Sequence, residues 1–128
     1  MNWRWIDRRL FVLLHDESLA MHGGASGIRD EGPLESALAR AAKLAAYGEP
    51  DVADLAAAYA DGLAKNHPFV DGNKRTAFLG VGLFLGLNGQ RLTASQAEAT
   101  VAVVGLASGE WDEPTFAAWL RSHLAPRR

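Results

Sequence analysis

Apolar residues recur along most of this chain at spacings of three and four, which is the period of one face of an α-helix. The sustained alternation of β-branched and polar residues that is typical of strands is missing. Gly, Pro, Asn and Asp separate the apolar segments, and these segments predict about six helices: 7–21, 34–47, 51–66, 73–88, 95–108 and a last one that begins at 112–114. We therefore expect an all-α helical bundle in which any strands are short.

The ends of these segments carry recognisable helix signals. Asp51 or Asp54 can cap the third helix, and Ser95 with Glu98 forms a capping-box pattern for the fifth. Pro68 opposes continuation of the third helix, so the chain must turn at His67. The first helix has four candidate buried residues: Leu10, Leu13, Leu14 and Met21. The last helix is expected to carry four large apolar side chains: Phe116, Trp119, Leu120 and Leu124.

The segment 73–88 is apolar nearly all round, which predicts a helix at the centre of the bundle. The loop 23–32 before the second helix contains four glycines and three charged residues, a composition typical of an exposed connection. The apolar stretch 77–87 is too short to span a membrane, and the first residues lack the pattern of a signal peptide. We accordingly expect a cytoplasmic protein without a membrane partner.

Composition narrows the class of protein. The chain has 128 residues, 48% of them hydrophobic, so we expect one domain over 1–128, with 126–128 as a frayed tail. The absence of cysteine excludes thiol catalysis and disulfides. A net charge of −2 argues against general binding of nucleic-acid phosphates, and no direct nucleic-acid partner is expected.

The polar turn 67–76 is the candidate functional site. If Asn73 caps the apolar helix, then Lys74 and Arg75 lie in its first turn, where the helix dipole disfavours cations. Bound phosphate would explain this placement, because helix amide groups, Gly72 and two cations together can hold an anion. Each residue also has an ordinary explanation as a cap, a turn residue or a solvated charge, but their combination within nine positions favours a site.

Two further residues of this turn suggest chemistry on the bound phosphate. Asp71 can hold a magnesium ion that bridges phosphate oxygens. His67 can accept a proton near neutral pH, as a general base does. The remaining histidines, His15, His22 and His123, belong to no motif and are expected at surface or half-buried positions.

This segment resembles the signature of the Fic/Doc family, which is H-x-F-x-[D/E]-G-N-G-R-x-x-R in the Fic branch and H-x-F-x-D-A-N-K-R in the Doc branch. The residues that match the Doc form are His67, Phe69, Asp71, Asn73, Lys74 and Arg75. Gly72 is the Fic choice at its position. The segments 27–30 and 34–40 also resemble death-on-curing toxins, so the resemblance covers most of the chain.

The resemblance implies a Fic-type helical domain that uses ATP and Mg²⁺. His67 would be the base acting on a target hydroxyl and Asp71 the magnesium ligand. The nucleotide phosphates would lie against Gly72, Asn73, Lys74, Arg75 and Thr76. Lys74, with Arg75, would also take part in catalysis, and Phe69 would anchor the motif in the core.

Two departures from the Fic signature bear on the reaction. Lys74 replaces a glycine and Phe78 replaces the second arginine. By resemblance, Doc-type proteins transfer the γ-phosphate and Fic-type proteins transfer AMP, so Lys74 favours a protein kinase, with elongation factor Tu as the implied target. An AMP transferase, or a catalytically silent module that acts with an antitoxin, remains the alternative. Gly72 leaves the orientation of the nucleotide open.

Regulation and target docking are also implied by the resemblance. The inhibitory motif [S/T]-x-x-x-E-[G/N] of many Fic proteins is absent, which favours a separate antitoxin of the Phd kind whose tail folds in a groove of the toxin. The loop 23–32 lies where the family docks its target. Arg29, Asp30 and Glu31 are therefore either target contacts or a solvated connection.

Overall fold

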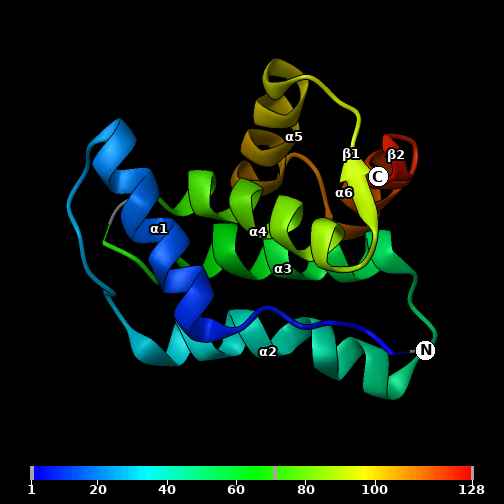
Figure 1. Cartoon of the computed structure of the whole chain (residues 1–128), viewed down its shortest axis with the longest axis horizontal. Helices are drawn as coiled ribbons and strands as arrows, with labels where there is room; N and C mark the ends of the chain where they lie inside the picture. The colour runs from blue at the N-terminus through cyan, green and yellow to red at the C-terminus, as the bar shows by residue number, and fades with distance from the viewer. Residues whose placement is uncertain (1, 71, 128) are drawn as a thin grey trace.

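The computed structural model describes residues 2–70 and 72–127, and within them the chain folds into six helices and one two-stranded sheet (Figure 1). The helices are α1 Arg8–His22, α2 Glu31–Tyr47, α3 Val52–Asn66, α4 Asn73–Leu87, α5 Gln96–Ser108 and α6 Glu113–Arg121. The strands are β1 Gln90–Leu92 and β2 Leu124–Pro126. The prediction of an all-α bundle with short strands is confirmed. No helix in this part of the chain combines the length and the apolar character needed to cross a membrane.

Most helices begin at an acidic or hydroxyl side chain that accepts hydrogen bonds from amides of the first turn. These N-cap residues are Asp7, Asp30, Asp51, Ser95 and Asp112. Asp51 forms a reciprocal capping box with Asp54, and Ser95 forms one with Glu98, as expected. The loop before α2 is shorter than predicted, because capping by Asp30 lets the helix begin at Glu31.

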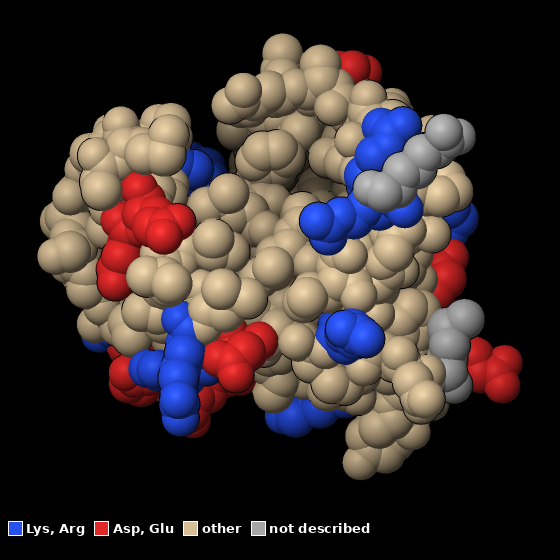
Figure 2. Space-filling model, viewed as in Figure 1, with Lys and Arg blue, Asp and Glu red and all other residues tan. Residues whose placement is uncertain are grey.

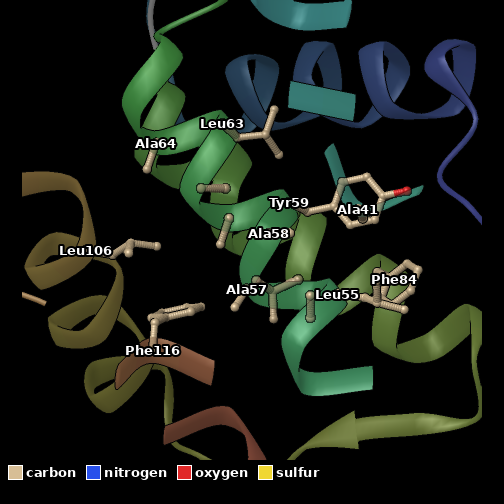
Figure 3. Packing of buried hydrophobic residues seen from close by; sticks show 14 of the residues in the cluster. Ala41, Leu55, Ala57, Ala58, Tyr59, Leu63, Ala64, Phe84, Leu106 and Phe116 are labelled. Carbon is tan, nitrogen blue, oxygen red and sulfur yellow. The ribbon is translucent and has the colours of Figure 1, made fainter. Parts of the chain in front are cut away.

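The hydrophobic core is built around α3, which contacts α2, α4, α5 and α6. Residues 55–60 are all buried, and Figure 3 shows side chains of α3 facing Leu106 and Phe116 on one side and Phe84 on another. A glycine permits the close approach of α2, since a Cβ atom at Gly62 would lie 3.0 Å from the Ala37 Cα atom. The helix α4 packs against α1, α3 and α5 but is fully buried along one face only, so the predicted place at the centre of the bundle belongs to α3.

The predicted buried face of α1 was wrong. Leu10, Leu13 and Met21 are exposed, and Leu14 is half-buried. The buried residues are instead Phe11, His15, Ser18 and Leu19. Both sets have helical spacing, so the pattern alone could not choose between them. The choice is made by packing, because α1 flanks the bundle and presents only one side to α4 (Figure 1).

The C-terminal segment is ordered by pairing rather than frayed. Pro126 lies opposite Gln90 in the antiparallel sheet, and the Arg127 amide donates to the Gly89 carbonyl over 2.9 Å. Leu124 therefore belongs to β2 and not to the last helix. The prediction of a frayed tail over 126–128 was therefore wrong for Pro126 and Arg127, and Arg128 lies outside the described residues. The strand depends on a partner more than 30 positions away in sequence, which local composition cannot reveal.

An ion pair across the bundle predicts a pH dependence of stability. The Arg121 guanidinium donates to the Asp51 carboxylate at 2.6 and 3.1 Å and holds its pKa at about 2, below the ordinary 3.8. A lowered pKa stabilises the fold above about pH 4, and this stabilisation is lost as the pH falls toward 2.

We expect Arg121→Gln to lower the melting temperature at pH 7 and to have little effect near pH 2. Melting curves of parent and variant from pH 2 to 7 test this, with Arg91→Gln, at an exposed position in β1, as control. A constant difference at all pH values would contradict it.

Candidate active site

The turn that joins α3 to α4 begins with an unusual backbone conformation at His67. This residue ends α3 with φ 47° and ψ 54°, the left-handed region that non-glycine residues seldom adopt. The following Pro68 adds to the cost, since proline disfavours helical conformations in the residue before it. The His67 side chain is nevertheless exposed. Strained, exposed residues of this kind concentrate at functional sites.

A cleft of about 580 Å³ opens beside this turn. Its walls come from the end of α1, the turn itself, the first turns of α4 and one face of α5, and Figure 2 shows the surface hollowed between α1 and α5. The lining residues are His22, His67, Val70, Gly72, Asn73, Lys74, Arg75, Phe78, Gln96, Thr100, Val103 and Val104. The volume is in the range of small-molecule sites.

The N-terminus of α4 carries positive charge into the cleft. Gly72 is the N-cap, with φ 75°, a conformation that favours glycine. Unlike the caps of the other helices, glycine has no side chain to accept from the amides of the first turn. Lys74 is exposed and Arg75 is half-buried, with its Nη1 atom 3.5 Å from the Ser18 carbonyl. The described lining contains both cations and no carboxylate, an arrangement that suits an anion.

The structure corrects the expected role of Asn73 as the N-cap. Asn73 is the first helical residue of α4, and its carboxamide holds the preceding turn. The Phe69 amide donates to Asn73 Oδ1, and Asn73 Nδ2 donates to the Phe69 carbonyl, both over 3.0 Å. The side chain therefore fixes the shape of the turn, while the backbone of Asn73 lies in the first turn of the helix.

Thr76 does not line the cleft. It is 1% exposed, and its hydroxyl donates to the Gly72 carbonyl over 2.7 Å. This contact supports the start of α4 from within. The Thr76 side chain therefore does not make the expected phosphate contact.

Phe69 anchors the turn in the core, and a histidine supports it. The Phe69 ring is buried against Phe11, and the His15 ring stacks on it with centroids 3.7 Å apart and planes 13° apart. His15 is also fully buried, which corrects the expected surface or half-buried position. A Cβ atom at Gly72 would lie 3.7 Å from His15 Nε2, so the histidine lies directly behind the glycine cap of α4.

The loop before α2 pairs with the turn. Ile28 forms an isolated antiparallel bridge with Phe69, and the Val70 amide donates to the Gly27 carbonyl over 3.1 Å. The Arg29 and Asp30 amides donate to the Pro68 carbonyl. The segment proposed to dock a target thus lies against the turn.

The charged side chains of this segment have contacts of their own. Asp30 caps α2, and Glu31 forms an exposed ion pair with Arg8. The Arg29 guanidinium lies 3.4 Å from the Asn66 carbonyl. Asp71, the expected magnesium ligand, lies outside the described residues. Within the part of the chain that the structure describes, no group of three acidic, histidine or cysteine side chains is placed to hold a metal ion.

Comparison with known proteins identifies the family. Residues 5–85, which include the whole turn, match the model of the Fic/DOC family. The chain belongs to the Fic/DOC family. It is 35% identical over 119 residues to "Protein kinase doc" of Escherichia phage P1, a match that covers 92% of this chain and 94% of the relative. It is 45% identical over 75 residues to "Toxin Doc" of Mycolicibacterium smegmatis, covering 56% and 57% of the two chains.

Several residues that line the cleft of this Fic/DOC protein were missed by the sequence reasoning. His22 lies at the end of α1, and Gln96, Thr100, Val103 and Val104 lie on α5. No local motif marks them. Since α5 meets the family motif only through the tertiary fold, helical spacing gives no sign of which of its faces borders the cleft.

Proposed function

We propose that the chain is a Doc-type toxin with protein kinase activity, which transfers the γ-phosphate of ATP to a Ser or Thr hydroxyl of a protein. The observation that carries the proposal is the cleft in which His67 lies with Lys74 and Arg75 at a glycine-capped helix N-terminus. Relatives named as a protein kinase and as a toxin support it.

His67, Lys74 and Arg75 each have one role in the proposed phosphate transfer. His67 accepts the proton of the attacking hydroxyl as its oxygen bonds to the γ-phosphorus, and the bond from that phosphorus to the bridging oxygen breaks to release ADP. Lys74, Arg75 and the α4 amides stabilise charge on the phosphate oxygens. The exposure of His67 leaves its imidazole accessible to a protein hydroxyl.

In this proposal Asp71 is the protein ligand of a magnesium ion. One carboxylate together with phosphate oxygens and water is a usual set of ligands for Mg²⁺. When bound, the ion would neutralise charge on the phosphates. The described lining of the cleft contains cations but no carboxylate. The proposed magnesium site therefore rests on Asp71, the acidic residue of the motif.

The identity of residue 74 favours γ-phosphate transfer over AMP transfer. A lysine side chain occupies the first turn of α4 where the Fic signature has a bare glycine, and Phe78 lines the cleft where that signature has an arginine. Both changes alter the surface that would hold the α-phosphate. A Fic-type AMP transferase is the second candidate, because Gly72 follows the Fic form of the signature. A silent binding module is less well supported, since the motif histidine and both cations line the cleft.

The proposed protein target is elongation factor Tu, whose modification would stop translation in the cytoplasm. The pairing of the loop 27–30 with the His67 turn supports docking there, since a target held by Arg29, Asp30 or Glu31 would lie beside the proposed base. The amide contacts of this loop to Pro68 use its backbone. The outward parts of its charged side chains are the proposed docking groups.

The proposed regulator is a separate Phd-like antitoxin. Val70 and Val104 line the cleft while remaining 51% and 45% exposed, so the groove offers apolar surface to a partner helix. An antitoxin seated on α5 and the turn would cover the cleft and prevent access of the target.

The choice among these functions is tested by incubating the purified protein with Mg²⁺, elongation factor Tu and ATP labelled at the α- or the γ-phosphate. We expect label on the target from γ-labelled ATP alone. Transfer from the α-position would establish AMP transfer and overturn the interpretation of Lys74. Absence of transfer from either position, to purified target and to a bacterial lysate, would favour the binding module.

A further inference from the structure

Hydrogen bonds on both sides of His67 hold its left-handed backbone. Before it, Asn66 Nδ2 donates to the Pro33 carbonyl over 3.1 Å, which ties the end of α3 to the start of α2. After it, the Pro68 carbonyl accepts from the Arg29 and Asp30 amides over 2.8 and 3.2 Å. A non-glycine residue persists in this conformation before proline when its surroundings determine the geometry.

Among the side chains that the structure describes, Asn66 is the one best placed to supply this support. It is half-buried and directly precedes His67, whereas Arg29 is exposed and reaches the Asn66 carbonyl over a longer 3.4 Å. The carboxamide of Asn73 holds Phe69, two residues after His67, and belongs to the family motif. Asn66 lies outside the matched motif positions and outside the cleft lining.

We infer that Asn66 is a positioning residue for His67. Its bond to Pro33 fixes where α3 ends and hence the direction in which the His67 imidazole leaves the turn. Asn66 touches neither nucleotide nor target in this role. The inference rests on the proposed function in so far as His67 is the base of the reaction.

Two substitutions at this position test the inference. Asn66→Ala removes the carboxamide, and Asn66→Asp keeps its shape but cannot donate to the Pro33 carbonyl. With γ-labelled ATP we expect kcat to fall about tenfold in both, because small displacements of a reacting group are costly. KM for ATP should change by less than about twofold, because Lys74 and Arg75 keep their places.

A second measurement does not depend on activity. A positive φ gives a strong intraresidue cross-peak between the amide and Hα protons in NMR spectra. We expect this cross-peak of His67 to be strong in the parent and weaker in both variants, which would show that the left-handed conformation has lost population.

The matched control is Asn88→Ala, at the other end of α4. Asn88 Nδ2 also donates to backbone carbonyls, those of Arg4 and Phe84, over 3.0 and 2.9 Å. This variant should melt at a lower temperature and keep the parental kcat and the parental His67 cross-peak. An equal loss of kcat in Asn88→Ala would show that general destabilisation explains the effect and would overturn the inference.

Other outcomes are equally decisive. Parental kcat and an unchanged His67 cross-peak in both Asn66 variants would overturn the positioning role. A raised KM for the protein target with kcat unchanged would also overturn it, because that result describes a docking contact. If the parent protein itself transfers no phosphate, the proposed function fails, and the cross-peak alone decides whether Asn66 holds the turn.

Discussion

Replacement of His67 is expected to slow phosphate transfer strongly while leaving the fold intact. Loss of a general base reduces such reactions by roughly 10²- to 10⁴-fold, so both His67→Asn and His67→Ala should fall in this range. The side chain is exposed, so little packing is lost. Asparagine also tolerates the left-handed backbone that His67 adopts at φ 47°. The rate of γ-phosphate transfer and the melting temperature of each variant test the expectation.

The comparison of the two variants separates chemistry from strain. His67→Asn should melt close to the parent, whereas His67→Ala should melt at a slightly lower temperature, because alanine is less suited to the positive φ of this position. His123→Ala is the matched histidine control, because His123 follows α6 and is absent from the cleft lining. It should retain activity. A His67→Asn protein that transfers phosphate at the parental rate and still arrests growth would refute the assignment of the base.

Truncation of Phe69 is expected to cause the largest loss of stability among the motif residues. Its ring is 1% exposed and packs against α1, where it contacts His15 and Phe11. Removal of a buried phenylalanine side chain costs about 3–5 kcal/mol, a large share of the 5–15 kcal/mol that is usual for a domain. We expect Phe69→Ala to lower the free energy of unfolding by this amount. Urea denaturation followed by circular dichroism measures it.

Two further variants show whether the loss of stability in Phe69→Ala comes from the buried ring. Phe69→Leu retains apolar volume and should cost clearly less than the alanine variant, because the cavity is smaller. Tyr47→Ala, at a side chain that is 91% exposed, should change the free energy by no more than about 0.5 kcal/mol. If Phe69→Ala unfolds at the same urea concentration as Tyr47→Ala, Phe69 does not anchor the motif in the core.

Sequence patterns predicted the helices well because their signals are local. The residues that cap α3, α5 and α6 act on amides three residues away, so their effect was read in the same stretch of sequence. The cap of α2, Asp30, was missed, and that helix begins three residues earlier than predicted. The cap of α4 was placed one residue too late. Asn73 is a strong capping residue in general, but its carboxamide bonds instead to both polar backbone groups of Phe69.

The candidate site was predicted in part for the same reason. His67, Gly72, Lys74 and Arg75 lie within nine positions, and all four line the cleft. The opposite wall on α5 was not predicted, and neither was the burial of His15 behind Phe69. These residues approach the motif from distant segments, and nothing in their own neighbourhoods marks the contact.

The sequence by itself determined the helical class, most helix ends and the family motif, because capping, helical spacing and a compact signature depend on neighbours along the chain. The tertiary structure decided which face of α1 is buried, the pairing of β2 with β1, the left-handed backbone of His67 and the wall of the cleft on α5. These features depend on how surfaces from distant segments pack. A helix such as α1 can have more than one face with apolar residues at helical spacing, and only one of these faces packs into the core. The energy of the assembled bundle selects among them, and that energy is not a property of any one segment.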